Sequence, residues 1–292
     1  MGCRFEFMLN PRDSSHDRYS VEAIADEMVE LVHDWHDRLT VFSPESVVSR
    51  FNRHPVSVPM AVDRELFELL ELCEALRIET RGAFNIASGT LMHANGFRDS
   101  ASETSLDDLD LEHAIKIDPN ELSVTRNDQR ISIDFGAIAK GHVLDLIGIE
   151  LQAYGIKHAF IHGGTSSSLS IGEREPSSPW KVRLSENPTV DATFDGVMGL
   201  GISDISGRQI ESHDGSEHGH IMDPLSRTPV SSSISRIACT HQRAAIADAY
   251  STALNVRPDL IDTLHNDECS IAIFDATALI RDRTRVFAYA AN

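Results

Sequence analysis

A carboxylate, two glycines and a lysine lie close together at residues 134–141, which read Asp-Phe-Gly-Ala-Ile-Ala-Lys-Gly from Asp134 to Gly141. Glycine allows a sharp turn and a close approach of a ligand to the backbone. The free N–H groups at the start of a following helix, together with Lys140, form a type of site that binds phosphate. The same residues also suit a tight turn followed by a solvated lysine. The segment lacks the GxxxxGK[ST] pattern of a Walker loop.

Oxygen-bearing side chains also gather at Asp248, Ser251 and Thr252. Asp248 and Thr252 are four residues apart, so a helix places them on one face. A carboxylate and a hydroxyl are hard oxygen ligands, the kind that Mg²⁺ prefers. A purely structural alternative exists, because an aspartate near a helix start interacts favourably with the helix dipole and threonine often binds the carbonyl four residues earlier.

Two further segments offer a base and an aromatic side chain. His220, within His-Ile-Met-Asp-Pro, titrates near neutral pH and could accept a proton from an incoming hydroxyl, although it is one of 14 histidines. Residues 82–86 read Gly-Ala-Phe-Asn-Ile, and Phe84 and Asn85 could hold a flavin or a nucleobase by stacking and hydrogen bonding. A phenylalanine in such a loop can equally belong to the core.

The elements that must position these residues mix helices and strands without a strict βαβ order. Apolar residues three and four apart predict helices over 20–39 and from Asp63 to about Leu76. Helices over 139–154 and 244–255 would carry Lys140 and Asp248. Strands are predicted at 4–9, 131–135, 159–161, 180–184, 197–202, 234–239 and 270–274. Because GxGxxG is absent, this pattern favours an α+β fold over a Rossmann domain.

Composition and charge narrow the class of protein. The 292 residues suffice for one large domain, or two intimate lobes, around a real core. A net charge of −19 disfavours nucleic acid as a partner, so any dinucleotide site must be locally positive. No transmembrane segment is predicted, because no run of about 18 apolar residues occurs. The four cysteines form no CxxC pair, which disfavours zinc and a disulfide framework.

Taken together and in this order, the segments resemble the FAD:protein FMN transferase, or ApbE-type flavin transferase, family over nearly the whole chain. Residues 134–141 are similar to the family pattern D-[LF]-G-[AG]-I-A-K-G, and residues 247–253 to AD-[AG]-x-[SD]-TA. Residues 1–5 resemble MGT-x-F, residues 46–52 resemble S-x-[LI]-S-x-[IL]-N, and residues 82–85 resemble GAFD. Residues 161–164, 206–207 and 220–224 are similar to N-x-GG, SG and HIIDP.

The resemblance implies an α+β fold with a T-fold-like core of mixed sheets and packed helices, formed as one domain over residues 1–292. It also implies FAD as the substrate, Mg²⁺ at the FAD diphosphate and a flavin-acceptor protein. A threonine or serine hydroxyl of that acceptor would attack the phosphorus, and AMP would leave. Family members are often periplasmic or membrane-anchored through a leader; no leader is visible here, and the compartment is left open.

The family's functional residues can be carried over by position. The metal would bind the carbonyl of Ala137 and the side chains of Asp248 and Thr252, with Ser251 adjacent. His220 is the candidate catalytic base. The FAD contacts would be Met1, Ala83, Phe84, Asn85, Asp134, Lys140 and the backbone near Ile221.

Two departures from the family pattern bear on activity. Asn85 replaces the usual aspartate of the FAD loop, which makes that contact neutral, and Ser251 stands where some members have aspartate. Two alternatives accompany the transferase hypothesis. One is an FAD pyrophosphatase with water as the nucleophile, and the other is a flavin-binding member without turnover.

Overall fold

The computed structural model of the chain describes residues 2–12, 14–95, 106, 108–186, 189–205, 209–211, 217–219, 221–232, 234–265, 268–275, 279–283 and 287–289. Its helices are α1 (Arg18–Leu39), α2 (Val47–Arg53), α3 (Arg64–Glu79), η1 (Ile86–Ser88), α4 (Gly89–Ala94), α5 (Ala139–Ala153), α6 (Ala244–Val256), η3 (Pro258–Leu260) and α7 (Ile261–Leu264). Its strands are β1 (Phe5–Asn10), β2 (Met60–Ala61), β3 (Ile115–Asp118), β4 (Ser123–Arg126), β5 (His158–Gly163), β6 (Ser167–Ile171), β7 (Trp180–Glu186), β8 (Thr189–Phe194), β9 (Met198–Asp204), β10 (Gln209–Glu211), β11 (Glu217–Gly219), β12 (Met222–Asp223), β13 (Thr228–Pro229), β14 (Ile234–His241), β15 (Ser270–Asp275), β16 (Leu279–Arg283) and β17 (Phe287–Tyr289).

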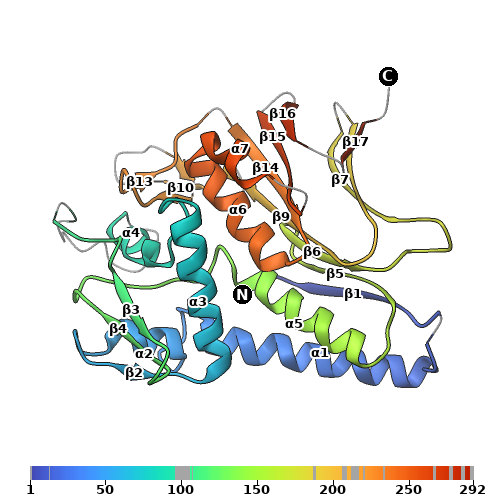
Figure 1. Cartoon of the computed structure of the whole chain (residues 1–292), viewed down its shortest axis with the longest axis horizontal. Coiled ribbons are helices and arrows are strands. Elements are labelled where there is room, and N and C mark those ends of the chain that lie inside the picture. Colours follow the sequence, from blue (N-terminus) through green and yellow to red (C-terminus); the bar gives the residue numbers. More distant parts are fainter. Residues whose placement is uncertain are drawn as a thin grey trace.

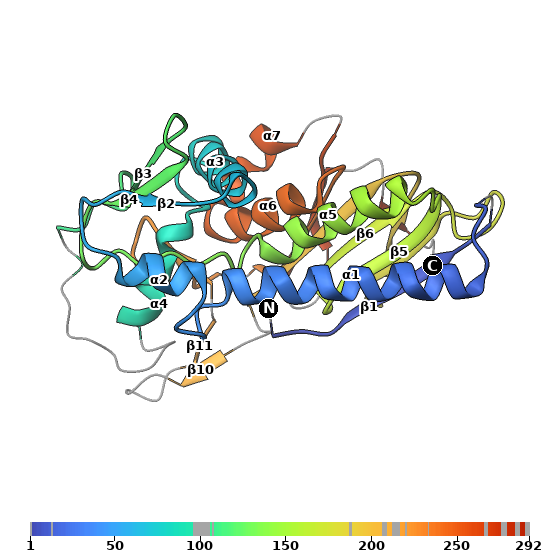
Figure 2. The same cartoon turned by 90° about the horizontal axis from the view of Figure 1, so that it is seen from below.

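A seven-stranded sheet with the order β1-β5-β6-β9-β14-β15-β16 forms the centre of the described fold. Every neighbouring pair in it runs antiparallel. Helices α5 and α6 pack on one face, with α1 beyond α5 (Figures 1 and 2). The three-stranded sheet β17-β8-β7 covers the opposite face.

Both faces of the central sheet are apolar because both are covered. In β5, Ala159 and Ile161 belong to the cluster under the helices, whereas Phe160 packs with Trp180 and Phe194 of the small sheet. A second group of elements lies beside the central sheet and comprises α2, α3, α4 and the sheet β2-β4-β3 (Figure 1). The arrangement confirms the predicted α+β class.

Side-chain caps fix the starts of α1 and α3. The Asp17 carboxylate accepts the N–H of Ser20 at the start of α1, and the Asp63 carboxylate accepts the N–H of Leu66 at the start of α3. Such a cap satisfies one of the backbone donors that the first helical turn leaves free. The predicted helices over 20–39, 63–76, 139–154 and 244–255 are confirmed as α1, α3, α5 and α6.

The predicted strands are confirmed as β1, β5, β7, β9, β14 and β15, with one exception. The strand predicted at 131–135 is wrong, because this segment joins no sheet. Its backbone groups bind side chains and a loop instead: Asn52 pairs with Ile133, and Thr90 bonds to the N–H of Ser132. Within the described residues, no helix is both long and apolar enough to cross a membrane.

Candidate functional site

The N-terminal ends of α5 and α6 meet, and this contact joins the two sharpest sequence motifs. The N–H of Gly141 donates to Oδ2 of Asp248 over 2.8 Å, and the Ser167 hydroxyl donates to Oδ1 over 2.7 Å. The Nζ of Lys140 lies 4.0 Å from Oδ2 of Asp248. The structure therefore brings the predicted phosphate-binding segment and the predicted metal-binding helix together around one carboxylate.

Glycines allow this close approach. A Cβ atom added at Gly141 would lie 2.2 Å from the carbonyl oxygen of Ala244, and one at Gly199 would lie 2.4 Å from the Cα of Ala244. A Cβ at Gly201 would lie 2.4 Å from the backbone of Ala247. Because these neighbours are backbone atoms, any side chain would push α6 away from α5 or β9. The absence of side chains at these glycines therefore allows α6 to pack closely against α5 and β9, which buries the Asp248 carboxylate.

Asp145, one turn after Gly141 on α5, caps the start of α6. Its Oδ1 accepts the N–H of Ala244 at 2.6 Å, and its Oδ2 accepts the N–H of Ala245 at 3.1 Å. The residue at the usual cap position, Arg243, makes no capping side-chain bond. Burial raises the pKa of Asp145 to about 6, although the two N–H donors and Arg243 act in the opposite direction.

The Asp248 carboxylate is buried, with 4% of the residue exposed. Desolvation raises its pKa, and Lys140, the Ser167 hydroxyl and the Gly141 N–H oppose that rise. The Lys140 ammonium is too far away for a direct hydrogen bond. A second cation beside this carboxylate would therefore stabilise its charged form.

The residues present fit Mg²⁺. Among the described residues, each Asp248 oxygen accepts one hydrogen bond and so retains a lone pair for a metal. In a continuous helix the N–H of Gly141 would bind the carbonyl of Ala137, but here it is directed to Asp248. Thr252 is half-buried one turn beyond Asp248. A carboxylate, a carbonyl and a hydroxyl form a hard-oxygen donor set.

Ser251 uses its hydroxyl proton within α6. Its Oγ donates to the backbone carbonyl of Asp248 over 2.8 Å, and the residue is 2% exposed. Ser251 therefore makes the hydrogen bond to a preceding backbone carbonyl that serine and threonine often make in helices. Its role as a metal ligand stays a prediction.

Asp134 shapes the turn that leads into α5. Its Oδ1 accepts the N–H of Gly136 over 2.5 Å, and its own N–H donates to the carbonyl of Ile86 over 2.8 Å. The first bond closes a turn just before Ala137, and the second ties the turn to Ile86, the first residue of η1. The structure thus places Asp134 next to the 82–86 segment.

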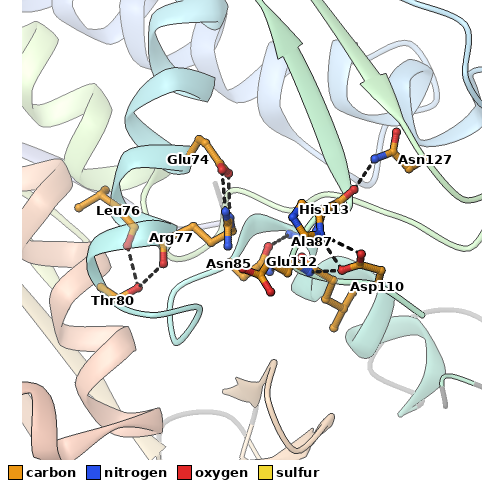
Figure 3. A network of polar contacts seen from close by, with 11 residues as sticks. Glu74, Leu76, Arg77, Thr80, Asn85, Ala87, Asp110, Glu112, His113 and Asn127 are labelled. Carbon is orange, nitrogen blue, oxygen red and sulfur yellow. Dashed lines mark hydrogen bonds and ion pairs between the residues drawn. The ribbon is translucent and has the colours of Figure 1, made fainter. Parts of the chain in front are cut away.

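The loop predicted to contact FAD has its side chains turned into the protein. Ala83 and Phe84 are each 2% exposed and belong to the main core. Asn85 donates from Nδ2 to the carbonyl of Leu111 over 2.9 Å and accepts the N–H of Ala87 at Oδ1, also over 2.9 Å (Figure 3). In this structure the Phe84 ring belongs to the core, as the structural alternative predicted. The FAD contacts of the loop stay a prediction.

A small pocket beside Asn85 is lined in part by Glu74, Arg77 and Glu112. The Arg77 guanidinium binds both carboxylate oxygens of Glu74, at 2.7 and 2.8 Å (Figure 3). The charge of Arg77 is therefore already balanced, and Glu112 adds a negative charge. This pocket is unsuited to a phosphate group.

Two of the predicted site residues, Met1 and His220, lie outside the described residues. Ile221, which follows His220, is 5% exposed, and its carbonyl accepts the N–H of Val230 over 2.8 Å. Among the described residues, no three His, Cys, Asp or Glu side chains gather as a metal site. The Mg²⁺ site implied by the resemblance requires only one carboxylate.

The sequence reasoning did not connect several residues of the site with Asp248. Ser167 and the β9 glycines Gly199 and Gly201 come from segments distant from Asp248 in the chain, and no local pattern links them to it. Asp145 did have a signal, because it lies four residues after Gly141 and so on the same helical face.

Comparisons with known proteins agree on one family. The ApbE family model matches residues 1–271. An FAD:protein FMN transferase of Vibrio cholerae is 27% identical over 246 residues, which cover 79% of this chain and 72% of that relative. One of Klebsiella pneumoniae is 27% identical over 256 residues, covering 82% and 76%.

Solved structures show the same fold. The ApbE protein of Thermotoga maritima superposes with a TM-score of 0.82 at 20% identity, covering 96% of this chain and 94% of that one. The flavin transferase ApbE of Vibrio cholerae gives 0.78 at 19% identity, covering 99% and 94%. With the family pattern matched from residue 1 to residue 271 and the α5–α6 contact assembled, this chain belongs to the ApbE family.

Proposed function

We propose that this chain is an Mg²⁺-dependent FAD:protein FMN transferase, with residues 1–292 forming one transferase domain. It transfers FMN from FAD to a threonine or serine hydroxyl of an acceptor protein and releases AMP. The names of the curated relatives support the reaction. The observation that carries the proposal is the Asp248 carboxylate held between the Gly141 N–H and the Ser167 hydroxyl, with Lys140 beside it.

The binding of a diphosphate by so acidic a chain requires local positive charge. Lys140 and the positive end of the α5 dipole supply it, because an ammonium and the N-terminal end of a helix both attract phosphate oxygens. Asp134 orders the turn that leads into this helix. The FAD diphosphate would therefore lie at the start of α5, within reach of the Asp248 carboxylate.

Asp248, Thr252 and the carbonyl of Ala137 would hold the metal. Mg²⁺ bound there would neutralise the diphosphate and polarise the phosphorus. The acceptor oxygen attacks the FMN phosphorus, the bond from that phosphorus to the bridging oxygen breaks, and AMP leaves with that oxygen. His220 is the proposed base that takes the acceptor's hydroxyl proton.

Mass spectrometry of the full chain with FAD tests the proposal. The reaction is run with Mg²⁺ or with EDTA, and with or without an acceptor protein that carries a threonine acceptor motif. We expect FMN attached to the acceptor, and AMP in equal amount, only with Mg²⁺. FMN and AMP released without an acceptor would identify a pyrophosphatase. Bound FAD that remains intact in every condition would identify a flavin-binding protein.

A further inference from the structure

The segment 46–52 matches a family pattern, yet the proposed function assigns it no role. It forms α2, whose N-cap Ser46 accepts the N–H of Ser49 over 2.9 Å. Val48 and Phe51 anchor the helix in the core. These contacts fix the position of α2, so that its last turn presents Asn52 to the segment at 131–135.

The side chain of Asn52 makes the two backbone hydrogen bonds with Ile133 that a neighbouring strand would make in a sheet. Its Oδ1 accepts the N–H of Ile133 over 2.8 Å, and its Nδ2 donates to the carbonyl of the same residue over 3.0 Å. A side-chain amide therefore satisfies both backbone groups of one buried residue. This pairing explains why 131–135 is extended but belongs to no sheet.

A second link joins the same two segments. The Arg126 guanidinium is buried, with 7% of the residue exposed, and its Nη1 donates to the carbonyl of Asn52 over 2.6 Å and to that of Ile131 over 3.2 Å. Thr90 adds a bond of 2.8 Å from the N–H of Ser132. Successive residues of the segment are thus tied to the surrounding protein one by one.

This clamp ends immediately before the proposed FAD and metal contacts. Asp134 follows Ile133 directly, and its carboxylate closes the turn at Gly136. The turn then leads through Ala137 to Lys140. A displacement of Ile133 would be transmitted to Asp134 and Ala137, because no flexible linker separates them.

We propose that Asn52 is a positioning residue of the transferase site: its amide holds the 131–135 segment so that Asp134 and the Ala137 turn are set for FAD. This inference rests on the proposed function. At neutral pH, where an aspartate is ionised, an amide is the side chain of this length that offers both a donor and an acceptor at this spacing. A carboxylate would keep the acceptor for the Ile133 N–H but would repel its carbonyl.

The test compares Asn52→Asp and Asn52→Leu with the wild type, using the full chain. FAD affinity is measured from flavin fluorescence with Mg²⁺ and no acceptor, and circular dichroism reports folding. We expect FAD to bind about tenfold more weakly to both variants, which corresponds to about 1.4 kcal/mol. In the ligand-free protein we expect faster hydrogen exchange across 131–141.

A pH profile separates positioning from general stability. A protonated carboxyl offers one O–H donor and one C=O acceptor, the same pattern as the amide. Lowering the pH from about 8 to about 5 should therefore restore FAD affinity in Asn52→Asp but not in Asn52→Leu. If Asn52→Asp folds only at the lower pH, that rescue supports the donor–acceptor explanation. Failure to fold at both pH values overturns it.

Asn10 supplies the matched control. Its Nδ2 donates to the carbonyl of Arg174 over 3.2 Å and its Oδ1 accepts the N–H of Arg12 over 3.0 Å, at the end of β1. Asn10→Asp should leave FAD affinity unchanged at both pH values.

The inference would also be overturned by wild-type FAD affinity in both Asn52 variants, or by unchanged exchange across 131–141. A wild type that does not bind FAD would overturn the proposed function instead. The exchange experiment needs no ligand and still decides whether Asn52 holds the segment.

Discussion

The N–H of Gly141 donates to Oδ2 of Asp248 over 2.8 Å, although the two residues are 107 positions apart in the sequence. The bond crosses from the first turn of α5 to the first turns of α6. It diverts a helical donor away from Ala137 and toward a buried carboxylate. The chemistry proposed for this chain depends on that contact.

Replacing Gly141 with alanine should disrupt the site. The new Cβ would meet the Ala244 carbonyl oxygen at 2.2 Å, and because the atoms it meets belong to the backbone of α6, that helix must move. We expect a loss of about 3 kcal/mol in unfolding free energy and the loss of FMN transfer. Gly148→Ala is the control on the same helix, because its Cβ would meet only the end of the Leu169 side chain. Denaturant unfolding and acceptor labelling of both variants provide the measurement.

Asp248→Ala should remove the response to Mg²⁺. A ligand that binds only the folded state raises the melting temperature, so Mg²⁺ in the presence of FAD should stabilise the wild type and leave the variant unchanged. Transfer should fall to background. Full activity with a normal dependence on Mg²⁺ would refute the assignment of Asp248 as a ligand.

Asp145→Ala should destabilise α6 and weaken Mg²⁺ binding together. The substitution removes two capping bonds to the N–H groups of Ala244 and Ala245, which costs about 1–2 kcal/mol. Asp17→Ala removes a cap of the same kind from α1 and should lower stability without changing the Mg²⁺ concentration needed for half-maximal activity. Equal Mg²⁺ dependence in both variants would contradict the positioning role of Asp145.

His142 should make the protein sensitive to acid. Burial lowers its pKa to about 4, and Arg243 and Arg38 act in the same direction. The unfolded chain therefore binds this proton more readily, so the contribution is present above about pH 6.5 and is lost as the pH falls toward 4. The loss amounts to about 3 kcal/mol.

His142→Phe removes this titration while keeping a ring against Trp35, where the two rings now lie 4.5 Å apart. It also removes a buried Nε2 that has no hydrogen-bond partner among the described residues. We expect unfolding free energy near pH 5 to rise relative to the wild type. His113→Gln breaks an ion pair with Asp110 whose side chains are both exposed, and it should therefore change the acid profile little. If His142→Phe keeps the wild-type acid profile, another group controls the loss of stability in acid.

His220→Ala should slow FMN transfer by about two to four powers of ten if His220 is the general base. FAD affinity should change little, since the proposed role concerns the acceptor proton. Single-turnover labelling and FAD titration separate the two effects. An unchanged transfer rate would assign the base to another residue.

The sequence predicted much of this arrangement where the signal was local. The three- and four-residue spacing of apolar side chains identified α1 and α3, and the motif segments identified the starts of α5 and α6. β6 escaped prediction, because its sequence Ser-Ser-Leu-Ser-Ile places serines at buried positions and so hides the apolar pattern. The segment 131–135 was mistaken for a strand, because its alternating residues suit an extended backbone whether a sheet or Asn52 satisfies it.

The site itself shows the same limit. The motifs pointed to Lys140 and Asp248, whereas the contacts of Ser167 and Asp145 depend on how distant elements pack. Asn85 illustrates the opposite case: its departure from the family pattern was visible, but the carbonyl of Leu111 that receives its amide was not. Such partners are set by three-dimensional packing, which a single sequence does not encode in any short pattern.

The borrowed cap of α6 has a consequence for how the protein matures. Because α6 takes its first-turn acceptors from Asp145 on α5, it cannot complete its N-terminal end alone during synthesis or refolding. The carboxylate at Asp248 reaches its working place only once the two helices have docked. A partly folded chain in which the two helices have not docked would therefore lack the Asp248 site, and the site would form in the same step as native packing.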